Sequence, residues 1–349
     1  VELKNISKSF GNVVALRDVS FDIADGEFFV LLGPTGAGKT TTLRVIAGLE
    51  AQDEGSVTFD GQTVDDMTPA DRDTAFVFQQ YSLYPTMTVY DNLAFPLRSP
   101  MRKMPEPEIK TRVEEIAEIL RIGKLLGRKT GHLSGGEMQR VSIGRAIVRE
   151  PQIFLMDEPL SNLDAKLREA LRIELQHIQK TQGSTTLFVT HDQVEALTMA
   201  DRIAVLDQGR VVQIGSAHDI YDRPATVYVA QLVGTPRINL MDAMPQNGTL
   251  QVVDCPIGVP TDLYQGDLPD ECKLGIRPED VRLVSDGPFA GEVVLTEPLG
   301  VETVVHVKIG RQTLLSTQSG ITHYRPGDQI QCDIVRERLH FFDDEGQRI

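Results

Sequence analysis

Hydrophobic residues are distributed in two different ways along this chain. In the first two thirds, short apolar runs at 28–32, 153–156 and 185–189 alternate with longer stretches whose apolar residues recur every three or four positions. The short runs have the length and composition of buried parallel strands, and the longer stretches predict amphipathic helices. Strands that alternate with helices in this way indicate an α/β fold, with a sheet covered on both faces.

The α/β region contains a stretch without strand-like runs. Residues 88–150 are mostly helical in pattern, and Pro105 and Pro107 interrupt the entry to this stretch. We therefore expect a helical subdomain inserted at about 88–150. A further long helix is expected at 165–182, and its apolar face would consist of Leu167, Leu171, Leu175 and Ile178.

The pattern changes after about residue 234. The helical periodicity fades, and β-rich runs appear at 292–295, 303–307 and 329–335, separated by turns that contain Gly and Pro. Such spacing is typical of a small all-β domain, and we expect it to form a barrel. We therefore predict two domains, at 1–234 and 235–349.

Composition and charge narrow the class of protein. The 349 residues include 35 Lys and Arg against 50 Asp and Glu, a net charge of −15. A nucleic-acid binder needs a basic surface, so we expect no nucleic-acid partner. No apolar run approaches the ~20 residues that span a bilayer. The three cysteines form no CxxC pair, which disfavours a disulfide framework or a zinc site and is consistent with a reducing cytoplasm.

A glycine-rich segment after the run 28–32 carries the first candidate chemistry. It matches G-x-x-x-x-G-K-[ST], and a helical stretch at 41–49 follows it. Glycines let backbone N–H groups surround phosphates, and the next helix directs its positive dipole end toward them. Lys39 is expected to contact the β- and γ-phosphates, and the Thr40 hydroxyl to ligate Mg²⁺. The expected nucleotide-binding residues are Gly33, Pro34, Thr35, Gly36, Ala37, Gly38, Lys39, Thr40 and Thr41.

This motif alone indicates only that a nucleoside triphosphate binds. It does not separate a kinase, a GTPase and a transport motor, although the lack of a guanine-specifying N-K-x-D run weighs against a GTPase. The run 153–156 ends in Asp157 and Glu158. A strand would bring Asp157 beside the phosphate loop to hold Mg²⁺, and Glu158 would act as a general base toward the attacking water. The alternative is a strand that ends in an ordinary acidic turn.

The sequence Leu-Ser-Gly-Gly-Glu at 133–137, directly before a helical stretch, narrows the class further. Here the chain resembles the ATP-binding cassette (ABC) family over residues 1–234. The resemblance implies that Phe10 stacks on adenine, that Gln79 senses Mg²⁺ and a transmembrane partner, and that His191 lies near the γ-phosphate. The implied catalytic residues are Glu158, His191, Gln79 and Lys39, and the implied metal-binding residues are Thr40, Gln79 and Asp157.

The same resemblance implies a homodimer with two ATP molecules between its subunits. Each subunit already has a complete phosphate loop, so the helix start at 134–136 is a second anion site. The resemblance implies that this site caps the γ-phosphate bound by the partner subunit. The loop 161–164 would cross the interface. Relatives often have Gln at position 137, so Glu137 brings a carboxylate toward the phosphates. The residues expected to act in trans are Ser134, Gly135, Gly136, Glu137 and Asp164.

Two later segments, 192–202 and 209–215, closely resemble the carbohydrate-importer branch of the family, which includes ATPases for maltose, trehalose and glycerol-3-phosphate uptake. The motif at 274–280 and the β-rich remainder resemble the regulatory OB-type barrel of that branch. The expected fold is thus a P-loop NTPase core of the ABC type with a helical subdomain, followed by an OB-type barrel.

The resemblance implies an ATP-hydrolysing motor subunit of a sugar importer, with ATP and Mg²⁺ as cofactors. Two transmembrane permease subunits would dock into a groove lined by residues around 79–107, and an extracytoplasmic solute-binding protein would deliver the solute. The chain would lie peripherally on the cytoplasmic face of the inner membrane. Nothing in the motor sequence identifies the solute.

Three alternative functions compete with that of an importer motor. The first is a cassette protein that acts on nucleic acid or ribosomes through the barrel. It is disfavoured because residues 235–349 carry 10 basic and 18 acidic side chains, without the basic stripe that such barrels use. The second is a regulatory protein whose barrel binds a partner or metabolite, which the sequence leaves open. The third is an exporter ATPase, which the appended β-domain disfavours.

Overall fold

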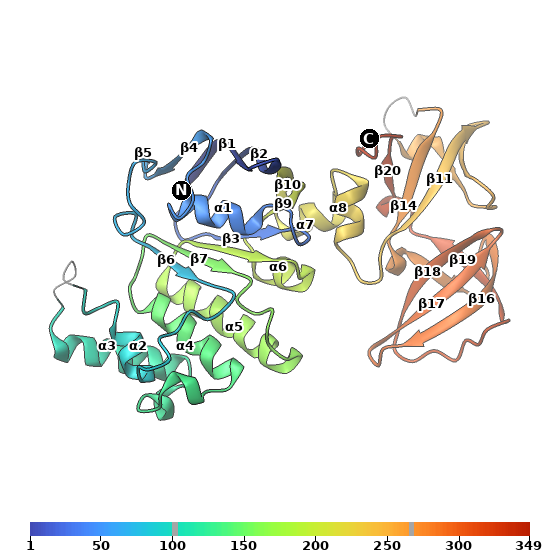
Figure 1. Cartoon of the computed structure of the whole chain (residues 1–349). Coiled ribbons are helices and arrows are strands. Elements are labelled where there is room, and N and C mark those ends of the chain that lie inside the picture. The colour runs from blue at the N-terminus through green and yellow to red at the C-terminus, as the bar shows by residue number, and fades with distance from the viewer. Residues whose placement is uncertain (100–103, 265–268) are drawn as a thin grey trace. The chain divides into compact units, whose positions relative to one another are not determined.

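The computed structural model describes residues 1–99, 104–264 and 269–349 and divides into two compact units, Val1–Ala217 and His218–Ile349 (Figure 1). Each unit has its own hydrophobic core. No helix within the described ranges is both long and apolar enough to cross a membrane.

A six-stranded sheet forms the centre of the first unit, in the order β10-β9-β3-β8-β7-β6. Four neighbouring pairs are parallel, and only β10 runs antiparallel to its neighbour β9. All residues of β3, β7 and β8 are buried, which explains their uninterrupted apolar runs. The strands are β3 (Phe28–Leu32), β6 (Thr74–Val77), β7 (Ile153–Asp157), β8 (Thr186–Thr190), β9 (Arg202–Asp207) and β10 (Arg210–Gly215).

A smaller antiparallel sheet, β2-β1-β4-β5, packs over one face of the first. Helix α1 (Lys39–Ile46) lies between the two sheets in Figure 1, and its Leu43, Val45 and Ile46 share their hydrophobic core. The sequence pattern did not distinguish this sheet from the parallel one. Its strands are β1 (Glu2–Phe10), β2 (Val13–Asp22), β4 (Glu54–Phe59) and β5 (Gln62–Thr63).

The predicted helical stretch lies between the adjacent strands β6 and β7, except for residues 100–103, which are outside the described ranges. Helix α5 (Ala165–Gln182) has the predicted bounds, but Leu167 on its predicted apolar face is only half-buried. Leu167 packs against Gly136, at the exposed start of another helix. The remaining helices are α2 (Val89–Ala94), α3 (Glu106–Ile119), η1 (Gly123–Leu125), η2 (Thr130–His132), α4 (Gly135–Ile147) and α6 (Gln193–Met199).

The second unit is built from two five-stranded antiparallel sheets around one apolar core, as the all-β prediction requires. Their orders are β13-β12-β11-β14-β20 and β15-β19-β16-β17-β18. The strands are β11 (Asn239–Gln246), β12 (Thr249–Val252), β13 (Gly258–Pro260), β14 (Cys272–Ile276), β15 (Val281–Val284), β16 (Phe289–Pro298), β17 (Glu302–Ile309), β18 (Gln312–Ser319), β19 (Gln329–Ile334) and β20 (His340–Phe342). Short helices join some of them: η3 (Thr261–Leu263), η4 (Pro278–Asp280) and η5 (Arg336–Arg338).

Helices α7 (Ala217–Asp222) and α8 (Val227–Leu232) precede these sheets. The predicted division at 234 placed both in the first domain, whereas the compact units group them almost entirely with the second. A buried side chain explains the grouping. The Arg277 guanidinium, which is 0% exposed, donates to three backbone carbonyls near these helices, those of Tyr221, Ala230 and Val233. The exact domain bounds remain a prediction.

The three cysteines, Cys255, Cys272 and Cys332, are free and buried in the second unit. Burial raises the pKa of each thiol, and that of Cys332 reaches about 11. They therefore act as small apolar core residues.

His340 makes the stability of the second unit depend on pH. It is 4% exposed, and burial, together with the charges of Arg277 and Arg348, lowers its pKa from 6.5 to about 4. The folded state binds the proton less readily than the unfolded state does. The free energy of unfolding therefore keeps its full value above pH 6.5 and falls by on the order of 3 kcal/mol as the pH drops toward 4.

We expect His340→Gln to flatten the dependence of the free energy of unfolding on pH between 6.5 and 4, as measured by urea unfolding. An unchanged pH dependence in the variant would contradict this assignment.

Candidate active site

The phosphate loop joins the buried strand β3 to helix α1. Gly36 and Gly38 have positive φ angles of 84° and 105°, a region that favours glycine. A Cβ atom on Gly38 would also lie 2.6 Å from the carbonyl oxygen of Ala15. The backbone therefore needs glycine at position 38, directly before the first residue of the helix.

Lys39 is held inside this loop. Its ammonium donates to the carbonyl oxygens of Gly33 at 2.8 Å and Pro34 at 2.9 Å, and the residue is 5% exposed. Burial lowers its pKa, although the carboxylate of Glu158, 3.6 Å away, opposes this shift. A cation in a partly dehydrated loop is well placed to attract an anionic ligand.

Thr40 and Asp157 bring two oxygen ligands together. The Thr40 hydroxyl donates to Asp157 Oδ1 at 3.0 Å across the gap between α1 and the end of β7. Burial raises the pKa of Asp157, and the nearby negative charge of Glu158 raises it further. Hydroxyl and carboxylate oxygens suit a hard cation such as Mg²⁺, which would favour the ionised form of this carboxyl. The residues present thus fit the expected metal.

Glu158 is the centre of the site. Its Oε1 lies 3.6 Å from Lys39 Nζ, and its Oε2 lies 3.2 Å from His191 Nδ1 and 3.4 Å from Gln79 Nε2. Gln79, Glu158 and His191 follow the parallel strands β6, β7 and β8, so the topology brings them to one edge of the sheet. The structure therefore brings Gln79 and His191 to the Glu158 carboxylate, which also contacts the phosphate-loop lysine.

The loop at 161–164 is attached to the same cluster. Ser161 Oγ donates to the Glu158 carbonyl at 2.9 Å, and Asn162 Nδ2 donates to the Gln79 carbonyl at 3.2 Å. Asp164 caps α5, because its Oδ1 accepts from the Leu167 amide at 3.0 Å. The loop 161–164 was expected at the subunit interface, with Asp164 as its one candidate site residue. The polar residues at 161 and 162 link this loop to the cluster.

The motif at 133–137 begins helix α4. Ser134 is its N-cap, and the Glu137 carboxylate accepts from the Ser134 amide and hydroxyl, both at 2.8 Å. These hydrogen bonds lower the pKa of Glu137 and keep it ionised. Glu137 thus completes a capping box with Ser134, a function that the sequence analysis did not assign.

Phe10 lies at the end of β1 and is 45% exposed, so one ring face is accessible to a ligand. The ammonium of Lys8 lies 5.3 Å from the ring centroid. Glu50 and Asp53 hold that ammonium at 3.3 and 3.2 Å. Lys8 was missed from the sequence, although two residues separated by one position share a face of a strand.

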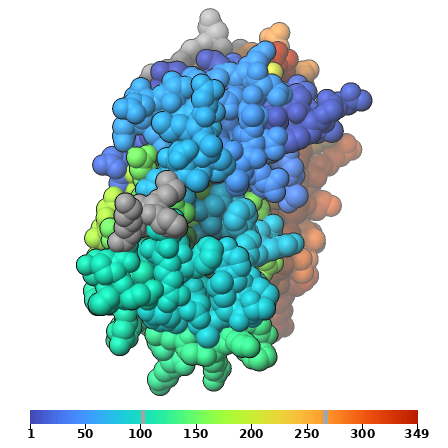
Figure 2. All heavy atoms as spheres, turned by 60° about the vertical axis from the view of Figure 1, so that its left-hand side comes forward, coloured from blue at the N-terminus to red at the C-terminus, as the bar shows by residue number. Residues whose placement is uncertain are grey.

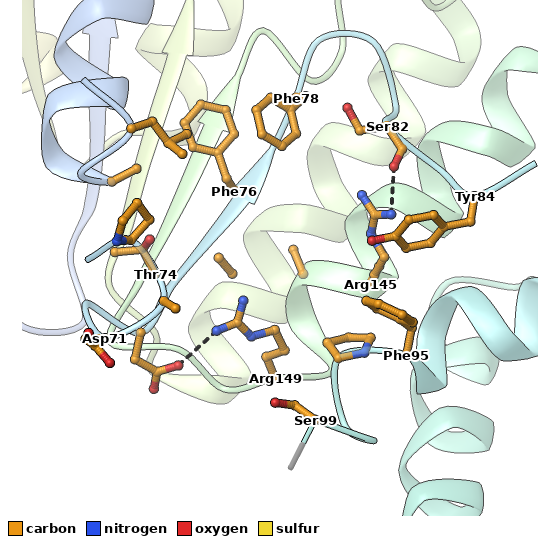
Figure 3. A pocket seen from close by; sticks show the side chains of 18 residues that line it. Asp71, Thr74, Phe76, Phe78, Ser82, Tyr84, Phe95, Ser99, Arg145 and Arg149 are labelled. Carbon is orange, nitrogen blue, oxygen red and sulfur yellow. Dashed lines mark hydrogen bonds and ion pairs between the residues drawn. The ribbon is translucent and has the colours of Figure 1, made fainter. Parts of the chain in front are cut away.

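A pocket of about 760 Å³ opens on the first unit, between the parallel sheet and the helical subdomain. The face brought forward in Figure 2 shows the N-terminal part of the unit, in blue, above the helical subdomain, in teal. Four aromatic side chains and two guanidinium groups line it (Figure 3). These are Phe76, Phe78, Tyr84, Phe95, Arg145 and Arg149.

Ion pairs and hydrogen bonds fix the two guanidinium groups. Arg145 donates to the Ser82 carbonyl at 2.7 Å and lies 5.5 Å from the centre of the Tyr84 ring, and Arg149 pairs with Asp73 at 3.0 Å (Figure 3). The predicted groove at 79–107 supplies only part of this aromatic pocket, and its residues 100–103 lie outside the described ranges. The rest comes from segments near 47–49, 69–78 and 145–149.

Known proteins resemble both parts of the chain. The ABC transporter family matches residues 16–161, and a TOBE domain matches residues 274–342. The trehalose/maltose import ATP-binding protein MalK of Thermococcus litoralis is 45% identical, over 98% of this chain and 97% of its own length. The sn-glycerol-3-phosphate import ATP-binding protein UgpC of Psychromonas ingrahamii is also 45% identical, over 98% and 93%. The xylose/arabinose import ATP-binding protein XacK of Haloferax volcanii is 45% identical over 96% and 90%.

Solved structures of ATP-binding cassettes are also similar to this chain. A dimeric ATP-binding cassette in a post-hydrolysis state with ADP and Pi is 33% identical with a TM-score of 0.56, and the match covers 62% of this chain and 98% of that one. An ATP-binding cassette of an ABC transporter in its ADP conformation is 28% identical with a TM-score of 0.56, over 65% and 96%. The chain therefore belongs to the ABC transporter family, as one of its ATP-binding cassette ATPases.

Proposed function

We propose that this chain is the ATP-hydrolysing motor subunit of an importer for a sugar or a related organic solute. The observation that carries the proposal is the cluster centred on Glu158, in which three strand ends and the phosphate loop meet. The import proteins to which the chain is similar over nearly its full length supply the transport context.

In this proposal, the phosphate loop binds the β- and γ-phosphates of ATP. Lys39 exchanges its contacts with the Gly33 and Pro34 carbonyls for phosphate oxygens, and the backbone amides add further donors. Thr40 and Asp157, with Gln79, would hold Mg²⁺, which when bound neutralises phosphate charge.

Glu158 then acts as the general base. Once Lys39 turns to the phosphates, the Glu158 carboxylate becomes available to accept a proton from the water that attacks the γ-phosphorus. The bond to the β-γ bridging oxygen breaks as the new P–O bond forms, so ADP leaves with that oxygen. Gln79 and His191 contact Glu158 Oε2 and would keep the carboxylate oriented during this step.

We further infer that the site is completed by a second copy of the chain. Ser134, Gly135 and Gly136 begin α4, and donors at a helix N-terminus suit a phosphate. With Glu137 and Asp164, they would act on the nucleotide of the partner subunit, while Phe10 would stack on adenine in the same subunit. The dimeric cassette with ADP and Pi supports this arrangement.

In the proposed dimer, the aromatic pocket of each copy would receive a segment of one of two membrane permease subunits. Its aromatic walls suit the apolar face of a short amphipathic helix. Phe78 lines the pocket, and the next residue, Gln79, contacts Glu158, so occupation of the pocket reaches the active site directly. An extracytoplasmic binding protein would deliver the solute, and this chain would lie on the cytoplasmic face of the membrane.

A pull-down of the tagged chain from detergent-solubilised native membranes tests the proposal. We expect mass spectrometry to identify two multi-span membrane proteins in the eluate. Recovery of ribosomal or nucleic-acid-binding partners without any membrane protein would leave the ATPase chemistry intact and overturn the transport function.

Glu158→Gln should abolish turnover while ATP still binds. The amide keeps the shape of the side chain but cannot accept the proton, so we expect kcat to fall by about 10²- to 10⁴-fold. Light scattering with MgATP should show a trapped dimer. Near-normal ATPase activity in this variant would reject Glu158 as the base.

The matched control is Lys39→Ala, which removes the cation but leaves the base. Because hydrogen bonds to charged groups contribute about 1.5–3 kcal/mol, ATP affinity should fall by about 10- to 100-fold. Unchanged binding by calorimetry would count against the phosphate-loop assignment.

Glu137→Gln should strengthen the ATP-dependent dimer. Gln also closes a capping box, so the helix start is retained while a negative charge near the phosphates of the partner is removed. In a Glu158→Gln background, the MgATP concentration for half-maximal dimer should fall about two- to fivefold, as expected for a partly exposed charge pair. Glu118→Gln, on the exposed side of α3, is the control. A weaker dimer would refute the expected repulsion.

A further inference from the structure

Arg72 is a buried cation outside the cluster around Glu158. It is only 4% exposed, and it lies in the segment before β6. Its neighbours Asp71 and Asp73 both line the aromatic pocket, whereas its own side chain extends to the end of helix α1. Arg72 therefore lies between two residues that line the pocket, and its side chain contacts the end of the phosphate-binding helix.

The contacts of the Arg72 guanidinium are all to backbone carbonyls. Nη1 donates to the Val45 oxygen at 2.8 Å and the Ile46 oxygen at 2.9 Å, in the last turn of α1. Nη2 donates to Asp65 at 3.3 Å, and Nε to Met67 at 3.4 Å. The last carbonyls of a helix lack intrahelical donors and form its negative dipole end, so a cation there is stabilised twice.

Gly48 provides the space for this arrangement. A Cβ at this position would lie 2.7 Å from Arg72 Nε and 2.8 Å from Cζ, and φ is +71°. Glycine is thus required both by the backbone and by the guanidinium that packs against it. Ala47 and Leu49, on either side of Gly48, line the aromatic pocket. The end of α1 that Arg72 binds is therefore also the end that adjoins the pocket.

Helix α1 is short enough to transmit a displacement from end to end. Its eight residues span about 12 Å. Lys39 and Thr40, at its first turn, carry the expected phosphate and metal contacts. A helix of about two turns moves as one rigid body. A shift of its last turn would therefore also move the side chains of Lys39 and Thr40.

We propose that Arg72 is a positioning residue that fastens the phosphate-binding helix to the wall of the aromatic pocket, so that a protein segment seated in the pocket sets the position of Lys39 and Thr40. The identity of that segment as part of a membrane subunit rests on the proposed function. The connection from Arg72 to the phosphate loop does not.

The first measurement tests that connection in the isolated full chain. Calorimetry with MgATP, well below the unfolding temperature, compares Arg72→Lys and Arg72→Met with the parent. A single ammonium cannot reach all four carbonyls, so we expect the Kd of Arg72→Lys to rise about fivefold or more. Should Arg72→Met fail to fold, Arg72→Lys decides the outcome.

Arg202→Lys is the matched control. Arg202 pairs with Glu27 at 2.7 Å and Asp22 at 2.9 Å and does not line the pocket. This change should lower the unfolding temperature without altering the Kd. An unchanged Kd in Arg72→Lys, or an equal rise in both variants, would overturn the proposal, because a purely stabilising role predicts either result.

The second measurement tests the connection from the pocket to Arg72. ATP turnover is measured with and without the co-purified membrane subunits, and we expect Arg72→Lys to reduce the ratio of the two rates about fivefold or more while Arg202→Lys retains it. A full ratio in Arg72→Lys would reject the link to the pocket. If the parent itself is not stimulated, the transport proposal fails, and the calorimetric result still decides the link between Arg72 and α1.

Discussion

The pairing of Lys39 with Glu158 is the interaction on which the arrangement of the site depends. The ammonium is largely removed from water, and its contacts are two carbonyls and this carboxylate at 3.6 Å. A buried cation without such partners would lose its proton or destabilise the fold. In the proposed function these contacts are exchanged for phosphate oxygens, so the nucleotide would replace the groups that hold the free site together.

The parallel sheet makes this pairing possible. Its parallel strands end at one edge, and the residues that follow β6, β7 and β8 converge there although they lie far apart in the sequence. For Glu158 and His191 this convergence was predictable, because each follows a strand-like run and parallel strands deliver their carboxyl ends together. Gln79 was expected there only from the family resemblance, since the short strand β6 before it was not predicted. The phosphate loop was also predictable, since its glycines, lysine and threonine lie within eight consecutive positions.

Side chains whose role depends on distant backbone were not predictable. Arg72 and Arg277 are both buried guanidinium groups that bind the last carbonyls of helices, and the helices concerned lie 26 and 44 residues or more away along the chain. A single arginine in a sequence carries no sign of such a partner. The same reason explains the placement of α7 and α8, because the grouping of these helices depends on Arg277 rather than on their own composition.

The two arginines also show how a cassette ATPase combines rigidity with response. A guanidinium enclosed by carbonyls fixes the end of a helix in direction as well as position, because its planar donors cannot rotate independently. At Arg72 the fixed helix carries Lys39 and Thr40, and the segment that fixes it borders the aromatic pocket. Coupling between the aromatic pocket and the phosphate loop requires a rigid connection. A flexible connection would absorb a displacement at the pocket before it reached the phosphate loop.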